Sequence, residues 1–193
     1  MRPEKSLAAE TKFVFNETGA ASPAPVVTNY GGYRQREKNR MASFGKAVKD
    51  FTLPATGGGT FKLSSARGKK LVLYFYPKDS TPGCTTEGVN FGELHKDFRK
   101  ANCEVYGISR DTLKSHENFK AKQGFPFELL SDAEEKACAL FEVIKMKNMY
   151  GKQVRGIERS TFVLDEEGKL VREWRGVKVT GHVQEVLSFV KTL

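Results

Sequence analysis

Apolar residues fall into two alternating patterns from about residue 51 to the end of the chain. One pattern is a short continuous or alternating run, typical of a β-strand, and residues 71–76 are the strongest example. The other repeats every three or four residues, as in Val183, Val186, Leu187 and Val190, and predicts an amphipathic helix. We therefore expect strands at 71–76, 104–108, 127–130, 160–164 and 170–174, and helices at 84–100, 111–123, 132–141 and 183–190, with Asp111 and Asp132 beginning two of the helices.

Two short apolar runs, 51–53 and 60–63, flank three consecutive glycines and predict an N-terminal β-hairpin. No Gly-Lys-Ser/Thr sequence follows these glycines at the required spacing, so they are not a phosphate-binding loop. A turn at 165–168 predicts a second hairpin late in the chain. Strands and helices that alternate in this way predict an α/β fold, with a mixed central sheet flanked by helices on both faces.

The first 41 residues differ from the rest of the chain. Residues 19–25 are rich in Ala, Ser and Pro, and residues 31–40 are polar and basic, without strong periodicity. We expect a poorly structured N-terminal extension over 1–41 and a domain over 42–193. The extension has no long apolar segment of the kind that secretory signals contain. Met41 is a candidate start of translation.

The chain carries a net charge of +9, but its Lys and Arg residues are interspersed with acids. This charge favours at most weak, nonspecific attraction to nucleic acid, because no helix or aromatic platform is arranged for specific binding. No run approaches the ~20 apolar residues of a membrane span. The 3 Cys and 3 His residues are scattered, so we predict no disulfide framework and no metal site. An odd cysteine count favours a reducing compartment, and we expect a cytoplasmic location.

Cys84 lies where the apolar strand 71–76 has ended and the helix 84–100 begins. The first turn of a helix has unpaired N–H groups and a partial positive charge. Both favour the thiolate over the thiol, and the thiolate is the reactive form. The sequence therefore places Cys84 in an environment that makes cysteines reactive.

Several kinds of reactive cysteine are possible at this position. A Cys-x-x-Cys redox pair is excluded, because Thr81 stands where the first cysteine would be. A protease-like nucleophile needs a histidine base. His95, His116 and His182 are in no recognisable partner motif, although the fold could bring a distant one nearby; His116 is expected on a helix surface. A lone thiolate that reduces peroxide explains the neighbouring residues best.

Four neighbours fit a lone thiolate, and each also has a purely structural interpretation. The Thr81 hydroxyl can point to the same place as the sulfur, or it can cap the helix. Pro77 ends the strand and can shield a pocket. Glu87 can orient an arginine, or it can complement the helix dipole. Arg159, just before the strand 160–164, is the candidate arginine, or else a surface cation.

Residues 76–87, Tyr-Pro-Lys-Asp-Ser-Thr-Pro-Gly-Cys-Thr-Thr-Glu, match the peroxiredoxin pattern Pro-x-x-x-Thr-x-x-Cys. In detail the segment resembles the bacterioferritin comigratory protein branch, also called PrxQ. Arg159, within residues 156–162, resembles the active-site arginine of that family. The similarity extends from about residue 45 to residue 193.

The resemblance implies a thioredoxin-like fold and a thiol peroxidase without a cofactor. The Cys84 thiolate would attack hydrogen peroxide or an organic hydroperoxide and become a sulfenic acid. Thr81 would orient the peroxide, and Arg159 would stabilise the thiolate and the transferring oxygens. Pro77 would shield the site, and Glu87 would orient the arginine. The branch also implies a monomer.

The two usual positions of a resolving cysteine in this branch are occupied by Val89 and Lys120. Cys103 should lie near the far end of the helix that begins at Cys84, and Cys138 is on an apolar helix face; both are interpreted as core residues. We therefore expect a one-cysteine enzyme that is reduced by thioredoxin or by glutathione and glutaredoxin. Two alternatives stay open: a redox sensor or holdase chaperone that is oxidised with little turnover, and a nucleic-acid binder.

Overall fold

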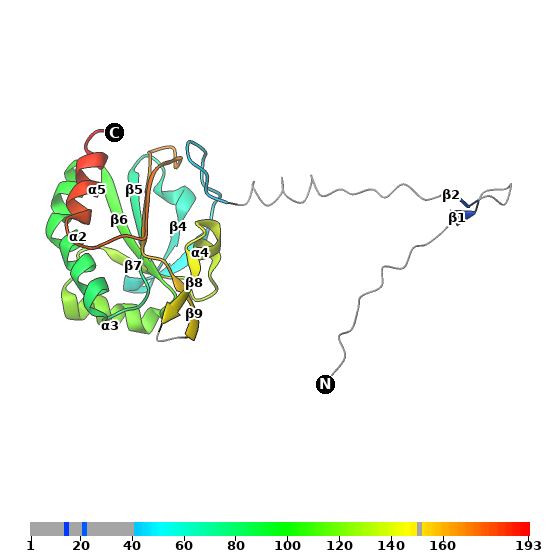
Figure 1. Cartoon of the computed structure of the whole chain (residues 1–193). Coiled ribbons are helices and arrows are strands. Elements are labelled where there is room, and N and C mark those ends of the chain that lie inside the picture. The colour runs from blue at the N-terminus through cyan, green and yellow to red at the C-terminus, as the bar shows by residue number, and fades with distance from the viewer. Residues whose placement is uncertain (1–13, 16–20, 23–40, 150–151) are drawn as a thin grey trace. The chain divides into compact units, whose positions relative to one another are not determined.

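The computed structural model describes residues 14–15, 21–22, 41–149 and 152–193 (Figure 1). The chain divides into two units, Met1–Asn39 and Arg40–Leu193. In the first unit, β1 (Val14–Phe15) pairs with β2 (Ala21–Ser22) in antiparallel orientation. The prediction of a poorly structured extension over 1–41 falls largely on residues outside the described ones.

The second unit is built on a sheet of 7 strands in the order β11-β10-β5-β6-β7-β3-β4. The three central strands β5, β6 and β7 are parallel, and every other pairing in this sheet is antiparallel. The predicted mixed sheet and the N-terminal hairpin, which is β3–β4, are confirmed. The strands are β3 (Thr52–Ala55), β4 (Gly59–Lys62), β5 (Lys70–Phe75), β6 (Cys103–Ser109), β7 (Glu128–Ser131), β10 (Ser160–Leu164) and β11 (Leu170–Arg175).

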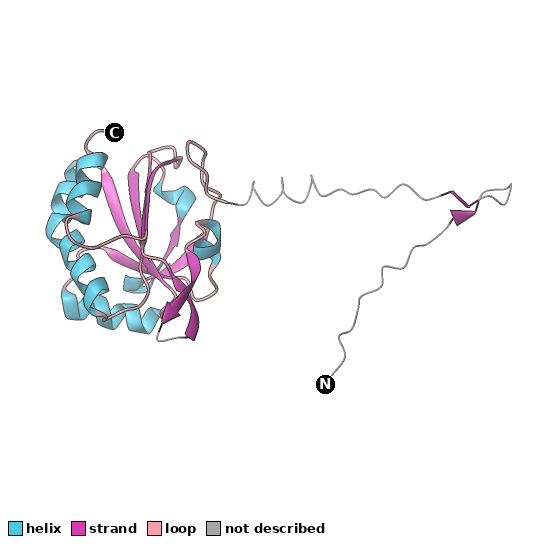
Figure 2. Cartoon of the chain, viewed as in Figure 1, coloured by secondary structure: helices cyan, strands magenta, loops and turns pink. Residues whose placement is uncertain are grey.

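Helices cover both faces of this sheet, as predicted (Figure 2). One face packs against α2 (Pro82–Lys100), α3 (Leu113–Gln123) and α5 (His182–Val190). The other packs against the short α4 (Lys136–Leu140), and residues of the β3–β4 hairpin at the sheet edge belong to the same core. Two 3-10 turns, η1 (Thr56–Gly58) and η2 (Leu63–Ala66), follow β3 and β4. None of the helices in the described part of the chain is long and apolar enough to cross a membrane.

Strand β5 shows why the run 71–76 is continuously apolar. Successive side chains of a strand point to opposite faces of the sheet. Val72, Tyr74 and Tyr76 lie in the core beneath α2, α3 and α5, whereas Leu71 and Phe75 lie in the core on the α4 side. A central strand that is buried on both faces needs apolar residues at every position. Cys84 therefore follows a central strand that is buried on both faces of the sheet.

Two helices begin later than the sequence predicts. Thr112, and not Asp111, is the N-cap of α3, and its hydroxyl accepts a hydrogen bond from the Ser115 amide at 3.3 Å. Asp132 precedes α4 by several residues, but its carboxylate accepts from the amides of Lys136 and Cys138, both at 2.7 Å. Asp132 thus supports the start of α4 from outside the helix, whereas the Asp111 carboxylate accepts from the Asp79 amide and the Ser109 hydroxyl.

The hairpin formed by β8 (Ile144–Met149) and β9 (Lys152–Ile157) was not predicted. Its sequence is dominated by Lys, Met, Gln and Arg, so it lacks the β-branched alternation that identifies a strand. Arg155 on β9 forms an ion pair with Glu135, which also pairs with Arg110 at 3.1 Å. These contacts join the hairpin to the end of β6, and β9 leads directly to Arg159.

Candidate active site

Cys84 is the third residue of α2, and its side chain is only 2% exposed. Thr81 is the N-cap, and Pro82 occupies the first helical position, where its missing N–H costs nothing. The amides of Gly83 and Cys84 have no intrahelical acceptor, because they lie in the first turn. The predicted position of Cys84, at the positive end of a helix that follows a buried strand, is therefore the one the structure shows.

Arg159 brings Cys84 and Glu87 together. Its Nη2 donates to the Cys84 sulfur at 3.2 Å, and its Nη1 forms an ion pair with Glu87 Oε2. Arg159 lies between β9 and β10, while the other two residues are one helical turn apart on α2. A Cβ on Gly83 would lie 3.3 Å from Arg159 Nη2, so the absence of a side chain there gives the guanidinium room. The sequence had assigned Gly83 no role.

The carboxyl group of Glu87 is fully buried, and this decides its electrostatics. Burial raises its pKa to about 7, against the opposing effect of the Arg159 charge and hydrogen bond. Its Oε1 has no hydrogen-bond partner among the described residues. Burial lowers the pKa of Arg159, but the negative charges of Glu87 and of the Cys84 sulfur outweigh burial and raise it. The guanidinium is thus a permanent cation beside the sulfur.

Thr81 and Pro77 shape the loop before Cys84. The Thr81 hydroxyl donates to the Lys78 carbonyl at 2.9 Å, so Thr81 is the N-cap residue of α2 but its side chain makes no capping hydrogen bond. The hydroxyl proton of Thr81 is used in the hydrogen bond to Lys78, but the lone pairs of the oxygen can still accept a hydrogen bond. The Tyr76 amide makes the last hydrogen bond to β6, with Ile108 at 3.1 Å. Pro77 has no N–H and ends the ladder there.

The structure corrects the prediction that His116 lies on a helix surface. His116 is completely buried, and its Nδ1 lies 2.9 Å from Asp79 in the loop before Cys84. His182 is also buried, and its Nε2 contacts the Thr161 hydroxyl at 2.8 Å. Each histidine uses a ring nitrogen in these contacts, and neither histidine acts as a base beside the Cys84 sulfur. The sequence signal that we missed was Asp79, an acid close to the end of a fully apolar strand.

Neither of the other cysteines is near Cys84. Cys138 packs in the core on the opposite face of the sheet. Cys103 pairs with Lys70 at the start of β5, whereas Cys84 follows the end of that strand; five steps of about 3.3 Å give ~17 Å along the sheet. Burial raises the pKa of Cys103 to about 12, and it also raises the pKa of Cys138. Both are buried thiols, as predicted.

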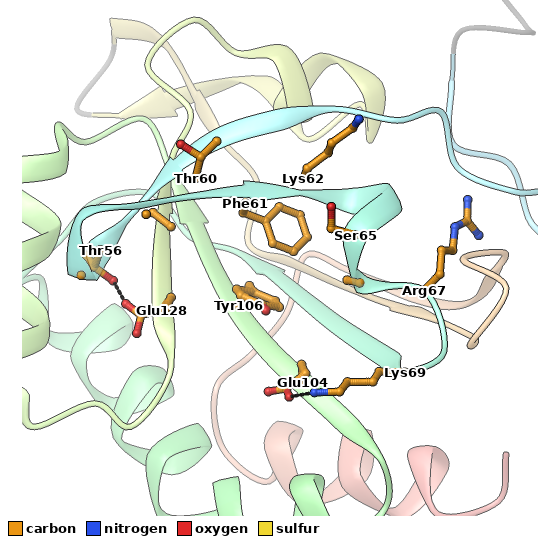
Figure 3. A pocket seen from close by; sticks show the side chains of 14 residues that line it. Thr56, Thr60, Phe61, Lys62, Ser65, Arg67, Lys69, Glu104, Tyr106 and Glu128 are labelled. Carbon is orange, nitrogen blue, oxygen red and sulfur yellow. Dashed lines mark hydrogen bonds and ion pairs between the residues drawn. The ribbon is translucent and has the colours of Figure 1, made fainter.

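A cavity of about 410 Å³ lies elsewhere, where the β3–β4 hairpin passes over β6 (Figure 3). Phe61 and Tyr106 lie in it with ring centroids 4.6 Å apart, and both belong to the core opposite Cys84. Its two carboxylates are already neutralised: Glu104 by Lys69 at 2.6 Å and by Arg99, and Glu128 by Lys120 and a Thr56 hydrogen bond. Both carboxylates of the cavity are therefore already paired with cations. Within the described residues, no three His, Cys, Asp or Glu side chains gather in a way that could hold a metal ion.

Comparisons with known proteins identify the family of this chain. Residues 44–173 match the AhpC/TSA family. Peroxiredoxin Bcp of Xanthomonas campestris is 57% identical over 145 residues, which cover 75% of this chain and 91% of that protein; Peroxiredoxin Bcp of Bacillus subtilis is 47% identical over 149 residues, which cover 77% and 95%. The solved structure of Peroxiredoxin Q from X. campestris matches with a TM-score of 0.73 and 54% identity over 78% of this chain and 96% of that one, and the thioredoxin-like fold is thereby confirmed. The chain belongs to the AhpC/TSA family and, within it, to the peroxiredoxins of the bacterioferritin comigratory protein or PrxQ branch.

Proposed function

We propose that this peroxiredoxin reduces hydrogen peroxide and organic hydroperoxides at Cys84 alone, and that an external thiol then regenerates it. Thiol-dependent peroxidase activity is the activity of its family. The observation that carries the assignment to Cys84 is the 3.2 Å contact between Arg159 Nη2 and the Cys84 sulfur at the start of α2. A fixed cation and a helix N-terminus both stabilise a thiolate.

The chemistry needs no group other than these side chains. The Cys84 thiolate attacks one peroxide oxygen, the O–O bond breaks, and the leaving oxygen departs as water or an alcohol after taking up a proton. Arg159 stabilises the charge that develops on the two oxygens. Thr81 accepts a hydrogen bond from the peroxide, Pro77 shields the sulfur, and Glu87 holds Arg159 in place. The product on the enzyme is Cys84 sulfenic acid.

Organic hydroperoxides belong to the proposed substrates for a specific reason. One structural study of the X. campestris bacterioferritin comigratory protein, 54% identical to this chain, concerns its alkyl peroxide reduction activity. The proposal extends that substrate class to this chain.

External reduction follows from where the other thiols lie. Cys103 is at the far end of the sheet and Cys138 is on its opposite face. Lys120, at a position where the branch can carry a resolving cysteine, forms an ion pair with Glu128. The sulfenic acid therefore condenses with an external thiol and releases water, and a second thiol reduces the mixed disulfide. Thioredoxin, or glutathione with glutaredoxin, is the proposed reductant.

The proposal includes a cytoplasmic monomer. All three cysteines are free thiols, which fits a reducing compartment. The monomeric state follows from the resemblance to the PrxQ branch, and sedimentation of the full chain tests it.

The first experiment is intact-mass analysis after one equivalent of hydrogen peroxide, with a sulfenic-acid trap present and peptide mapping of the product. We expect one adduct on Cys84 in the wild type and in a Cys103→Ser/Cys138→Ser variant, and none in Cys84→Ser. Loss of two hydrogens, with Cys84 joined to Cys103 or Cys138, would overturn the one-cysteine cycle.

A second experiment separates an enzyme from a redox sensor or holdase. Peroxide consumption is followed with thioredoxin and its reductase, and separately with glutathione and glutaredoxin. We expect many turnovers with one of these systems. A single stoichiometric oxidation with both would favour the sensor.

A further inference from the structure

Asp79 lies in the loop between Pro77 and Cys84, and its carboxylate is buried and surrounded by donors. The Tyr76 hydroxyl donates to Oδ1 and the Ser115 hydroxyl donates to Oδ2, both at 2.7 Å. His116 Nδ1 lies 3.0 Å from Oδ1 and 2.9 Å from Oδ2. Three side chains, two of them on α3, therefore converge on one residue of the loop that leads to Cys84.

The hydrogen-bond network determines where the protons are. His116 Nε2 lies 3.2 Å from the Leu130 carbonyl, which can only accept, so Nε2 carries a proton. The hydroxyls of Tyr76 and Ser115 both donate to Asp79, and together with His116 they lower the pKa of its carboxyl group despite burial, so Asp79 is an ionised acceptor. The proton between Asp79 and His116 must then be on Nδ1. With protons on both nitrogens His116 is an imidazolium, and the two residues form an almost completely buried ion pair.

The backbone of the loop is held as well. The Asp79 amide donates to Asp111 Oδ2 at 2.9 Å, and the Ser109 hydroxyl donates to the same oxygen at 2.6 Å. Ser80 follows with φ of 57°, a left-handed conformation that non-glycine residues rarely adopt. Such a conformation persists only where the surrounding contacts fix it. These contacts end one residue before Thr81.

We propose that the buried Asp79–His116 ion pair is a positioning pair, which fixes the loop carrying Thr81 relative to Cys84 and thereby sets the rate of peroxide reduction. Neither residue touches the peroxide. The pair joins the loop to α3 through His116 and to β7 through Leu130. A buried ion pair has strict geometric requirements, so it can specify one conformation of a loop. This inference rests on the proposed chemistry at Cys84.

The test compares two reactions of the same thiolate. Oxidation by hydrogen peroxide needs Thr81 and Arg159 in place around Cys84, whereas alkylation by iodoacetamide needs only an accessible thiolate. For Asp79→Asn and for His116→Asn we expect the peroxide rate constant to fall by about 10- to 100-fold, since a misplacement of 1 Å can cost this much. The alkylation rate should change by less than about 3-fold, because the cation beside the sulfur is unchanged. The double variant should be no slower than the slower single variant, since both changes remove one interaction.

The matched control is Asp132→Asn. Asp132 is also a buried, hydrogen-bonded aspartate, but it caps α4 and makes no contact with the loop between Pro77 and Cys84. It should lower stability and leave the ratio of the two rates unchanged. All rates are measured well below each variant's unfolding temperature. If Asp79→Asn does not fold, Tyr76→Phe removes one donor to Asp79 and keeps the ring, and it should lower the peroxide rate alone by roughly 3- to 10-fold.

Several results would overturn the proposal. Peroxide rates within about 2-fold of wild type in the folded single variants would do so, as would equal losses in both reactions or strictly additive losses in the double variant. These results differ from a failure of the proposed function, in which peroxide would not oxidise Cys84 even in the wild-type protein.

Discussion

Two buried carboxylates flank Cys84, and their surroundings differ. Asp79, before it, accepts hydrogen bonds from Tyr76, Ser115 and His116. Glu87, after it, has Arg159 as a partner for one oxygen, while Oε1 has no hydrogen-bond partner among the described residues. Burial raises the pKa of both groups, but the three donors around Asp79 outweigh burial and hold its pKa below the ordinary value. The pKa of Glu87 is raised to about 7.

The difference shows that the number of donors, and not burial alone, decides whether a buried acid stays charged. Asp79 is ionised throughout the neutral range and can act as a fixed anchor for its loop. Glu87 titrates near neutrality, one helical turn from the sulfur, so the negative charge that faces Arg159 depends on pH. The site therefore has a carboxylate whose charge is constant near neutral pH, Asp79, and one whose charge changes with pH, Glu87.

The largest effect is expected from removing the partner of Glu87. Arg159→Leu takes away both the Glu87 ion pair and the donor to the Cys84 sulfur, so peroxide oxidation of Cys84 should slow by about 10²- to 10³-fold, or ~3–4 kcal/mol in the barrier. Rapid-quench measurement of sulfenic acid gives the rate. Arg155→Leu breaks the exposed Glu135 pair and is the control, expected to stay within about 2-fold. Equal losses in the two variants would show that Arg159 has no special role.

Glu87→Gln should change the pH dependence of stability. Because the pKa of Glu87 is raised from 4.5 to about 7 in the folded protein, the native state binds the extra proton, and wild-type stability should fall as pH rises through this interval. The fall should be up to ~3 kcal/mol, at about 1.4 kcal/mol per pKa unit. The urea midpoint should depend less on pH between pH 4.5 and 8 for Glu87→Gln than for the wild type.

The control for this variant is Glu104→Gln. The pKa of Glu104 is lowered, because its hydrogen bonds to Lys69 and Arg99 outweigh burial, so its contribution has the opposite sign. Parallel pH profiles for the wild type and Glu87→Gln would mean that Glu87 has an ordinary pKa in the folded protein.

The position of Cys84 could be predicted from sequence because it depends on local patterns. A fully apolar run, a proline and a 3.6-residue repeat define a strand, its end and a helix within about 30 residues. Arg159 and Glu87 are far apart in the sequence; Arg159 was a candidate partner of Glu87 because of its place before a strand, and the resemblance to peroxiredoxins supported that choice. Their ion pair is what the structure adds.

The anchoring of Asp79 could not be predicted in this way. His116 has polar neighbours in sequence, which predict an exposed helix; it is buried because β7 and the loop before Cys84 close over it. That environment comes from segments separated by 14 to 37 positions, which no local pattern records. The β8–β9 hairpin was missed for a related reason, since its strands are polar and pair with each other outside the main sheet.

The smallest expected effect is also the most direct test of the comparison. Ser115→Ala leaves His116 as the only donor to Asp79 Oδ2, and so makes Asp79 more like Glu87. Losing a hydrogen bond to a charged group should lower stability at pH 7 by about 1–2 kcal/mol. The pKa of Asp79 should rise toward its ordinary value of 3.8. The stability that its low pKa provides is present above this value and is lost as the pH falls, so acid unfolding should begin at a higher pH in the variant. Urea midpoints between pH 3 and 7 give both quantities.

The control is Ser188→Ala, which removes a hydrogen bond to the Gln184 carbonyl on α5. It should change neither the urea midpoint at pH 7 nor the pH at which acid unfolding begins. If Ser115→Ala unfolds in acid at the same pH as the wild type, Tyr76 and His116 are sufficient to keep Asp79 ionised.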